Sequence, residues 1–415
     1  MAGERADLVV VGAGTVGGWA SVCARESGAA RVVVIDRGRA GDGASTRAAG
    51  MVRAQGGSPL TVALGRYSID FYRRQAAAEG TDSGFRELGY LILATSEEEG
   101  RAGRARVAMQ QRAGLDVRWV SPEQLRELDP SLDPDRIRGA SYAPGDGCID
   151  PPRNVRAYAL AMQRAGVELR EGTTFTGLRR SPAGRLLGVL TDRGEIEASR
   201  VILTGGPALR QVGEAAGIVI PVGAVRHQVF VTEPHPAFAA ERVAMGFDLA
   251  AGLYWRLEDG GLLFGMSNPD EPPGPARSID WAYYERMRAR LHAFLPVTQT
   301  LHLRKAWAAT IDYTPDHLPI LGPGLTASGE PMAGVTVAAA GGHGMMWGPA
   351  VARIAADLAL EGRTAVVDVQ DLGLDRFDAQ GRSRLETDPI ALPFPSAAAA
   401  DASALATSPS GGRTA

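Results

Sequence analysis

The order of hydrophobic and polar positions at the start of the chain predicts a βαβ unit. The run DLVVVG at residues 7–12 is a short apolar stretch that ends in glycine, as is typical of a buried strand. Residues 15–27 then carry small and apolar side chains at helical spacing, and Gly28 closes the helix. The run RVVVID at residues 31–36 predicts a second buried strand. Two strands joined by one helix in so short a span are expected to be parallel, with a right-handed crossover.

Further along, two patterns alternate. Residues 61–79 and 97–114 form polar helical patterns around one apolar strand at 90–94. Asp150 is placed to cap another helix, with Pro151 in its first turn. Apolar strands are then predicted at residues 188–191 and 200–204.

The second pattern extends from residue 222 to residue 303, where alternating strands surround one amphipathic helix at 281–294. A buried strand at 335–340 follows, and an apolar helix begins near Pro349. This alternation predicts an α/β fold, α+β overall, in which a Rossmann-like nucleotide-binding domain carries an inserted antiparallel-sheet domain.

The predicted nucleotide-binding domain is discontinuous, and the inserted domain comes in two pieces. We assign the first to residues 1–81, 146–221 and 306–375, and the second to residues 82–145 and 222–305. Residues 391–415 are rich in Ala, Ser and Pro and are predicted to form a disordered tail.

Composition narrows the class of protein. The chain has 415 residues, of which 45% are hydrophobic and 22% charged, as in ordinary soluble proteins. A net charge of −3 offers no basic surface for nucleic acid, and no apolar run is long enough to span a bilayer. Because the start of the chain also lacks a signal-peptide pattern, we expect a cytoplasmic protein. Cys23 and Cys148 have neither metal-site spacing nor a disulfide framework, so no metal is expected.

A glycine motif lies between the first predicted strand and its helix. Gly12, Gly14 and Gly17 form G-x-G-x-x-G, in which the glycines permit a tight turn, close approach to a pyrophosphate and close helix–strand packing. The amino terminus of the helix is suited to bind phosphate. Asp36 ends the second strand, where a carboxylate can accept hydrogen bonds from ribose hydroxyls and disfavours a 2′-phosphate. Together these features predict a dinucleotide site.

The loop at residues 41–57, GDGASTRAAGMVRAQGG, favours FAD over NAD. It consists mostly of small residues and carries Ser45, Arg47 and Arg53. The alternative interpretation is a flexible surface loop. Two arginines in a stretch with so few other charges suit a channel that holds the pyrophosphate and ring of a flavin.

The chain resembles the D-amino-acid-oxidase-like FAD flavoproteins, the group that contains glycine oxidase, sarcosine oxidase and D-amino acid dehydrogenase. The matching pieces, in the family's order from residue 8 to about residue 360, are VVVGAGTVGG, VVVIDRG, GASTRAAGMVR, RVILTGG, YTPDHLPILGP and GGHGMMWGPAV. Each piece is weak alone, but jointly they are specific.

The resemblance implies FAD bound at the interface of the two domains. The residues implied to contact it are Gly12, Gly14, Thr15, Val16, Gly17, Asp36, Arg37, Ala44, Ser45, Arg47, Ala49, Gly50, Met51, Phe175, Gly205, Gly342, His343, Gly344, Met345 and Met346. Some relatives attach the flavin through a histidine or a cysteine, and Arg47 and Ala309 stand near those positions here. We therefore expect non-covalent FAD.

The same resemblance implies hydride transfer from an α-carbon to flavin N5, and the residues suggest how the substrate is anchored. An arginine fork suits a carboxylate, which makes Arg53 and Arg256 the candidates. Tyr254 shares a strand face with Arg256. His343, in the loop GGHGMMWGP, is also a candidate catalytic residue, although a packing or helix-capping role is favoured over that of a general base.

Three departures from the family's pattern leave the substrate and the electron acceptor open. Ile311, Met346 and Leu263 occupy the positions of an arginine and two lysines that relatives use for carboxylate binding and oxygen activation. Carboxylate binding must then be built differently. Met345, Met346 and Trp347 suggest an apolar pocket roof and a substrate with a bulky or apolar group.

The expected activity is oxidation of a D-, cyclic or N-alkyl amino acid to an imine. Two alternatives remain, an FAD-dependent 2-hydroxy acid dehydrogenase and an FAD-carrying subunit of a heteromeric amino acid dehydrogenase. The expected partners are a small amine or amino acid and oxygen or another electron acceptor, with no nucleic acid and no integral membrane segment. Homo-oligomers and hetero-oligomers both stay open.

Overall fold

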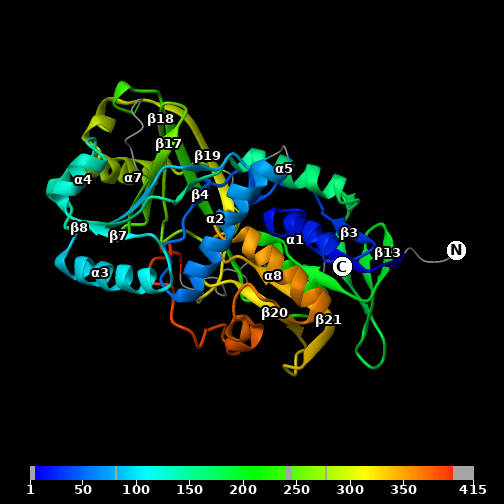
Figure 1. The fold of residues 1–415 in the computed structure, drawn as a ribbon. Helices are drawn as coiled ribbons and strands as arrows, with labels where there is room; N and C mark the ends of the chain where they lie inside the picture. Colours follow the sequence, from blue (N-terminus) through cyan, green and yellow to red (C-terminus); the bar gives the residue numbers. More distant parts are fainter. Residues whose placement is uncertain (1–4, 80–81, 239–244, 276–277, 396–415) are drawn as a thin grey trace, which may run out of the picture.

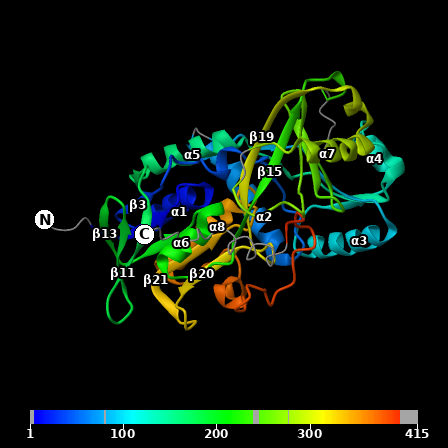
Figure 2. The same ribbon diagram turned by 180° about the vertical axis from the view of Figure 1, so that it is seen from behind.

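The computed structural model describes residues 5–79, 82–238, 245–275 and 278–395. Figures 1 and 2 show two units side by side, each built around its own sheet, with the chain crossing between them several times.

The first unit contains a six-stranded sheet that is parallel except at one edge. The predicted strands at residues 7–12 and 31–36 are present and pair in parallel, with Val9 opposite Val33. Only the last strand, β20, runs antiparallel to its neighbour β21. The sheet order is β10 (Glu168–Arg170), β3 (Val32–Ile35), β2 (Leu8–Val11), β14 (Val201–Leu203), β21 (Pro331–Ala339) and β20 (Ile320–Leu325).

Both faces of this sheet are covered, which explains why its strands are almost continuously apolar. Leu8 and Val10 point to the face covered by helices, whereas Val9 and Val11 point to the other face. The helices on the first face are α1 (Thr15–Glu26), α2 (Pro59–Glu79), α5 (Pro151–Arg164) and α8 (Gly348–Glu361). The opposite face carries α6 (Leu209–Ala216) and a four-stranded sheet of β1 (Arg5–Ala6), β13 (Gly194–Ala198), β12 (Leu186–Thr191) and β11 (Phe175–Arg180).

The second unit is an eight-stranded sheet, antiparallel except for one parallel pair, β16 with β6. Phe230 and Phe264 point to the face covered by helices, whereas Val229 and Leu263 point to the opposite face. The sheet order is β19 (Leu303–Tyr313), β15 (Gly223–Thr232), β18 (Gly261–Met266), β17 (Leu253–Glu258), β16 (Met245–Asp248), β6 (Tyr90–Ala94), β8 (Gly139–Ala143) and β7 (Arg118–Val120). Its helices are α3 (Glu97–Arg112), α4 (Pro122–Leu128) and α7 (Trp281–Phe294).

A small three-stranded sheet lies where the chain passes between the units. Its order is β4 (Met51–Val52), β9 (Gly147–Cys148) and β5 (Arg86–Glu87). The division of the chain into domains stays a proposal, and the boundary placed at residue 306 falls inside β19, a strand of the eight-stranded sheet.

The end of the described chain departs from the predicted tail. Residues 391–395 are placed against the fold: Leu392 packs on an apolar cluster and Phe394 stacks on the Tyr313 ring. The Ala391 amide donates to the Asp388 carbonyl oxygen at 3.1 Å and closes a turn, after which the apolar Leu392 and Phe394 follow. The prediction of a tail from residue 391 is wrong for these five positions; residues 396–415 lie outside the described part of the chain.

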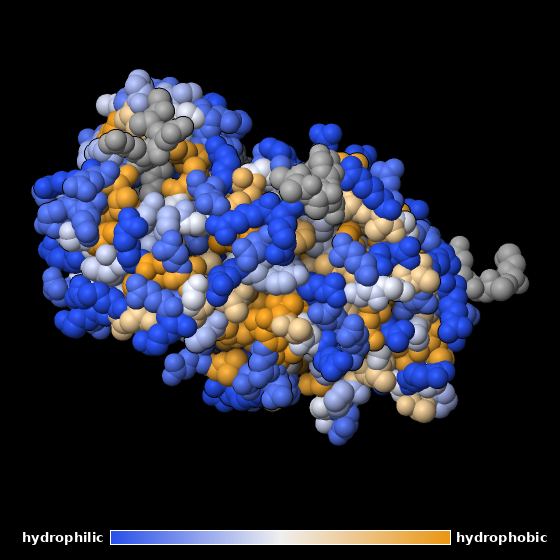
Figure 3. Space-filling view, in the orientation of Figure 1, coloured by the Kyte–Doolittle hydropathy of each residue, from blue (hydrophilic) through white to orange (hydrophobic). Residues whose placement is uncertain are grey.

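The surface in Figure 3 is largely hydrophilic, with smaller apolar areas distributed over it. In the described part of the chain, no helix combines the length and the apolar character needed to cross a bilayer.

Candidate functional site

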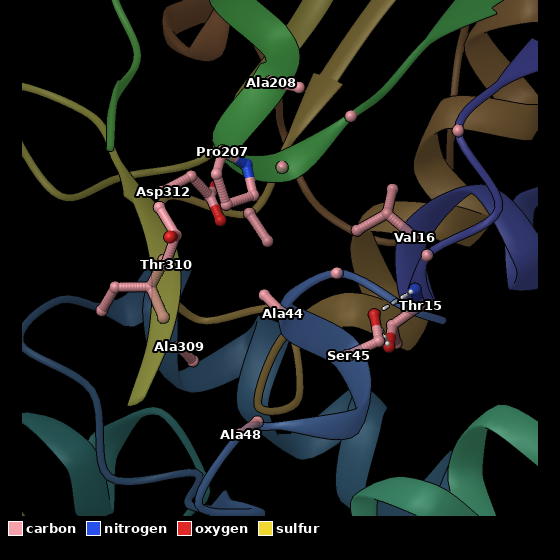
Figure 4. Close-up of a pocket in the computed structure, with 18 of the residues that line it drawn as sticks. Thr15, Val16, Ala44, Ser45, Ala48, Pro207, Ala208, Ala309, Thr310 and Asp312 are labelled. Atoms are coloured by element: carbon pink, nitrogen blue, oxygen red, sulfur yellow. Dashed lines mark hydrogen bonds between the residues drawn. The ribbon is translucent and has the colours of Figure 1, made fainter. Parts of the chain in front are cut away.

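A large cavity runs from the first unit to the second, with a volume of about 1410 Å³. Of the residues proposed from sequence to bind the cofactor or the substrate, only Arg256 is missing from its lining, and Trp347, expected in the apolar roof, is instead buried in the core of the first unit. Figure 4 shows part of the wall, with Thr15 and Ser45 on one side and Thr310 and Asp312 of β19 on another. The structure therefore brings together residues that are more than three hundred positions apart.

The glycine turn after β2 is as compact as its motif requires. Gly12 has φ +99°, and a Cβ on it would lie 2.6 Å from the Thr204 hydroxyl oxygen. A Cβ on Gly17 would lie only 1.9 Å from the Gly12 carbonyl oxygen, so helix α1 can approach β2 only if residue 17 is glycine. The backbone here leaves an open cradle at the cavity wall.

The amino terminus of α1 faces this cradle. Gly14 is its N-cap and supplies no side-chain cap, and the first turn holds no acidic residue. The Ser45 hydroxyl oxygen accepts hydrogen bonds from the Thr15 amide at 3.0 Å and from the Thr15 hydroxyl at 3.1 Å. These two bonds fix Ser45 beside the turn, and the helix dipole at this amino terminus favours an anionic group such as a pyrophosphate.

Asp36 marks the other end of the dinucleotide site. Its carboxylate accepts hydrogen bonds from the amides of Ala13 and Gly38, both at 2.8 Å, and it lines the cavity. Arg37, Phe175 and Gly205 line the same end, as predicted for residues around adenosine. The carboxylate is thereby fixed in orientation while part of it still faces the cavity.

The loop at residues 341–347 forms the wall near the second unit. Gly342 has φ +86°, and a Cβ there would lie 2.9 Å from the Asp312 carbonyl oxygen. A Cβ on Gly344 would meet no atom within 4 Å, so this position opens into the cavity. The carbonyl oxygen of Met345 accepts a hydrogen bond of 2.9 Å from the Tyr72 hydroxyl, which holds the loop against α2.

His343 is part of this wall but has a structural environment. Its Nδ1 lies 3.0 Å from the Gly341 carbonyl oxygen, and its ring centroid lies 4.1 Å from that of Trp347. Burial, reinforced by the positive charge of Arg53, lowers the pKa of His343 to about 3. The imidazole is therefore neutral at pH 7, in agreement with the packing role favoured from sequence.

The two arginine candidates have different surroundings. Arg53 is 4% exposed, lines the cavity, and donates to the carbonyl oxygens of Gln55 and Ile390. Arg256 is 3% exposed but lies outside the cavity lining. Its Nε donates to the Ala49 carbonyl oxygen at 2.7 Å. Arg256 thus supports the backbone of the predicted flavin loop, whereas Arg53 is placed to meet a ligand.

Sequence reasoning missed several residues of the wall in the second unit. His227 of β15 lines the cavity beside Tyr254, with its Nε2 2.6 Å from the tyrosine hydroxyl and the two rings stacked. Burial lowers the pKa of His227 to about 4 and raises that of Tyr254, so both are neutral at pH 7. Tyr90 and Phe247 complete this apolar end.

Two further wall residues lie outside the predicted set. Asp312 of β19 faces the cavity near Pro207 (Figure 4), and its burial raises the pKa of the carboxyl group. Leu392 lines the cavity from the segment that the sequence pattern assigned to a tail. The alternation of Ile390, Leu392 and Phe394 in the sequence could have indicated that these side chains pack against the protein. It does not indicate which surface they pack on.

The observed cavity fits the dinucleotide predicted from sequence. Glycine at positions 12 and 17 permits the tight turn and the close approach of α1 that a larger residue would prevent, and Asp36 is fixed where a ribose would lie. Gly12, Gly14, Thr15 and Ser45 would hold the pyrophosphate. The loop at residues 341–346 would lie beside the ring system.

Comparisons with known proteins agree with this geometry. The family model described as FAD dependent oxidoreductase (DAO) matches residues 7–358. The chain is 29% identical over 325 residues to 4-methylaminobutanoate oxidase (formaldehyde-forming) of Paenarthrobacter nicotinovorans, covering 74% of this chain and 38% of that protein.

Two solved structures have the same fold. L-Proline dehydrogenase from P. horikoshii matches with a TM-score of 0.84 and 25% identity, covering 92% of this chain and 100% of that chain. Glycine oxidase from Geobacillus kaustophilus matches with a TM-score of 0.78 and 26% identity, covering 91% and 100%.

The chain spans less than half the length of the first three curated relatives that it matches, namely 38%, 39% and 44% of them. The family match nevertheless covers most of the described fold, including the glycine cradle, both arginines and the loop at residues 341–347. The chain therefore belongs to the DAO family of FAD-dependent oxidoreductases, and the dinucleotide of its cavity is FAD.

Proposed function

We propose that this chain oxidises the amine group of an amino acid, with a D-, cyclic or N-alkyl amino acid as substrate. The observation that carries the proposal is the position of Arg53, a buried arginine at the wall of the same cavity that contains the dinucleotide cradle. A guanidinium group there can hold a carboxylate in a fixed orientation. The names of the similar proteins, a proline dehydrogenase, a glycine oxidase and a methylaminobutanoate oxidase, support the same substrate class.

When bound, FAD supplies the acceptor for a hydride from the carbon that bears the amine. The residues of the chain supply position and environment. Arg53 orients the carboxylate, while Tyr90, Phe247 and Tyr254 form an apolar wall that excludes water. His227 and His343 are neutral at pH 7, so they add no positive charge beside a substrate amine.

Anaerobic reduction of the bound flavin tests this function. The purified holoprotein is mixed without oxygen with a panel of D-, L-, cyclic and N-alkyl amino acids and a parallel panel of 2-hydroxy acids. We expect loss of the visible absorbance of the oxidised flavin with amino acids alone. Bleaching by hydroxy acids only would replace the proposal with a 2-hydroxy acid dehydrogenase. Bleaching by neither panel, with activity restored on co-expression with a partner subunit, would identify an FAD-carrying subunit.

Readmission of oxygen after bleaching addresses the electron acceptor. Return of the absorbance within the time of mixing indicates an oxidase, and slow return with fast recovery after a dye is added indicates a dehydrogenase. Leu263 stands where the family resemblance places a lysine for oxygen activation. It is buried in the same apolar cluster as Tyr254, so this position carries no cationic group.

We also propose that FAD is held without a covalent bond. Among the described residues that line the cavity there is no cysteine, and Nδ1 of His343 is engaged by the Gly341 carbonyl oxygen. Acid precipitation should therefore leave a colourless pellet and a yellow supernatant. A yellow pellet would contradict this prediction and would direct attention to His227.

A further inference from the structure

Residues 388–394, called here the C-terminal arm, lie beyond the family match, which ends at residue 358. In Figures 1 and 2 the red end of the described chain leaves the first unit and reaches the second. Ile390 is completely buried, and Leu392 lines the cavity. The arm is thus a part of the site that the family pattern does not describe.

The arm is held at both of its ends. The Asp388 amide donates to the Asp316 carbonyl oxygen at 3.2 Å. Gly57 leaves room for it, since a Cβ there would lie 2.2 Å from the Asp388 carboxylate. At the other end, the Phe394 ring stacks on His317 with centroids 5.2 Å apart, and it also packs near Gly342 of the cavity wall.

Between these ends the arm contacts the substrate side. The carbonyl oxygen of Ile390 accepts a hydrogen bond of 2.7 Å from the Arg53 guanidinium. Ile390 and Leu392 pack in the same apolar cluster as Phe247 and Tyr254. The arm therefore holds the proposed carboxylate anchor through its backbone and contributes an apolar side chain to the wall.

Two residues of the arm make different contacts with the site: Ile390 holds Arg53, and Leu392 forms part of the cavity wall. Arg53 also donates to the Gln55 carbonyl oxygen, so two backbone acceptors set the plane of the guanidinium and aim its remaining donors. Leu392 is the apolar group of the arm that reaches the cavity. A ligand carboxylate bound to Arg53 would therefore have its side chain near Leu392.

We propose that the C-terminal arm is the substrate-specificity element of this enzyme, with Leu392 limiting the size of the substrate side chain and Ile390 positioning Arg53. The inference rests on the proposed function and deepens it. The substrate would be an amine that carries a carboxylate, and Leu392 would limit the size of its side chain.

The test measures binding as well as turnover. Simple aliphatic carboxylic acids of increasing chain length are titrated into the FAD-loaded wild type, L392A and L385A, and the change in flavin absorbance gives each Kd. Leu385 is the matched control, a partly buried leucine of the same region that packs on the core of the first unit and not on the cavity. Flavin content and thermal midpoint establish that each variant is folded.

In L392A the ratio of affinities for long over short acids should rise by about tenfold, because removal of the leucine side chain makes room for extra methylene groups. The ratio of kcat/KM for large over small amino acids should move in the same direction. L385A should keep the wild-type profile of affinity against chain length. An unchanged profile in folded L392A would overturn the role of Leu392.

A truncation after Thr387 tests the contact between the Ile390 carbonyl oxygen and Arg53. A truncation after Pro395 is its control. The first variant should weaken binding of all carboxylates by about tenfold, since Arg53 loses its Ile390 acceptor, whereas the second should match the wild type. If the first fails to fold, F394A replaces it, because loss of the ring that stacks on Tyr313 and His317 releases the end of the arm and with it the position of the Ile390 carbonyl oxygen. Wild-type affinity in the folded variants would overturn the inference alone. Absence of carboxylate binding by the wild type would overturn both this inference and the proposed function.

Discussion

At the scale of single residues, two arginines with similar burial have different surroundings in the site. Arg53 and Arg256 are 4% and 3% exposed. The first follows a short edge strand and meets the cavity, whereas the second lies on β17 and reaches the Ala49 carbonyl oxygen. Burial therefore does not identify a ligand-binding arginine; the position of its donors does.

Exchange of each arginine for lysine should separate the two roles. R53K is expected to raise the Kd of a simple carboxylate by about tenfold or more, because lysine cannot form the planar fork. R256K should leave that Kd nearly unchanged and instead lower the thermal midpoint, since its hydrogen bond to the flavin loop is lost. Flavin absorbance titrations and thermal unfolding measure both effects. The reverse pattern would make Arg256 the anchor.

His227 gives the molecule a predictable response to acid. An unfolded histidine titrates near pH 6.5, whereas burial lowers the pKa of His227 to about 4 in the fold. Between these values the unfolded chain binds more protons than the native protein. The contribution of His227 to stability is therefore complete above about pH 6.5 and is lost as the pH falls towards about 4.

The variant H227Q should have a shallower loss of stability in acid. The difference in the free energy of unfolding between about pH 7 and about pH 4 is expected to shrink by about 3 kcal/mol, which follows from the size of the pKa shift. Urea unfolding at several pH values measures it. An identical slope in the variant and the wild type would mean that His227 stays solvated.

At the scale of elements, the strand–turn–helix at the beginning of the chain is the most constrained part of the site. Gly17 of α1 lies so close to the turn at Gly12 that a methyl group would overlap the carbonyl oxygen. The helix amino terminus that faces the cavity depends on this approach.

G17A should lower the free energy of unfolding by about 1–3 kcal/mol through overpacking and should reduce the amount of FAD that co-purifies. The control is G100A on α3, where a Cβ would meet only ordinary contacts, 3.7 Å or more away. That change should be neutral or slightly stabilising, because alanine favours helix. Thermal unfolding and flavin content distinguish the two. FAD retention by G17A at the wild-type level would contradict the packing argument.

The elements could be predicted from sequence because their signals are local. The helix at residues 281–294 has the predicted bounds, and Asp150 caps α5 by accepting from the Arg153 amide, as expected. The glycine cradle could also be predicted, because a tight turn, close helix packing and a helix amino terminus for phosphate all require the short motif of Gly12, Gly14 and Gly17.

The wall of the second unit could not be predicted. His227 lies on the same face of β15 as Val229 and Val231, but a strand pattern separates two faces without saying which one meets a cavity. The position of Leu392 could not be predicted either. Its apolar pattern is local, whereas Arg53, which lines the same cavity, lies almost three hundred and forty residues earlier in the chain. These positions depend on long-range packing.

At the scale of the whole molecule, a buried ion pair fixes the chain that leads to the C-terminal arm. Asp316 and Arg376 are 1% and 0% exposed, and their closest contact is 2.7 Å. Burial alone would raise the pKa of Asp316, but hydrogen bonds from Arg376 and Ser383 outweigh it, so the pKa is lowered. Asp316 belongs to the YTPD motif, which here serves as an anchor for residues that come sixty positions later.

D316N should lower the free energy of unfolding by about 3–5 kcal/mol, because it leaves the guanidinium of Arg376 buried without its partner. The loss should be visible at neutral pH and should diminish in acid, where the wild-type carboxylate becomes protonated. The exposed pair of Glu285 and Arg288 supplies the control. E285Q should unfold almost as the wild type does. Equal stabilities for D316N and E285Q would show that the ion pair contributes little.

The order of the strands has a consequence for how the FAD site is completed. In the parallel sheet Val9 pairs with Val201, which in turn pairs with Val335. One sheet thus combines segments more than three hundred residues apart, and Leu392 adds to the cavity wall from still later in the chain. The complete wall of the FAD site therefore exists only once the residues up to Leu392 are in place. By mass action, FAD bound in this completed site stabilises the folded arrangement of segments that lie far apart in the sequence.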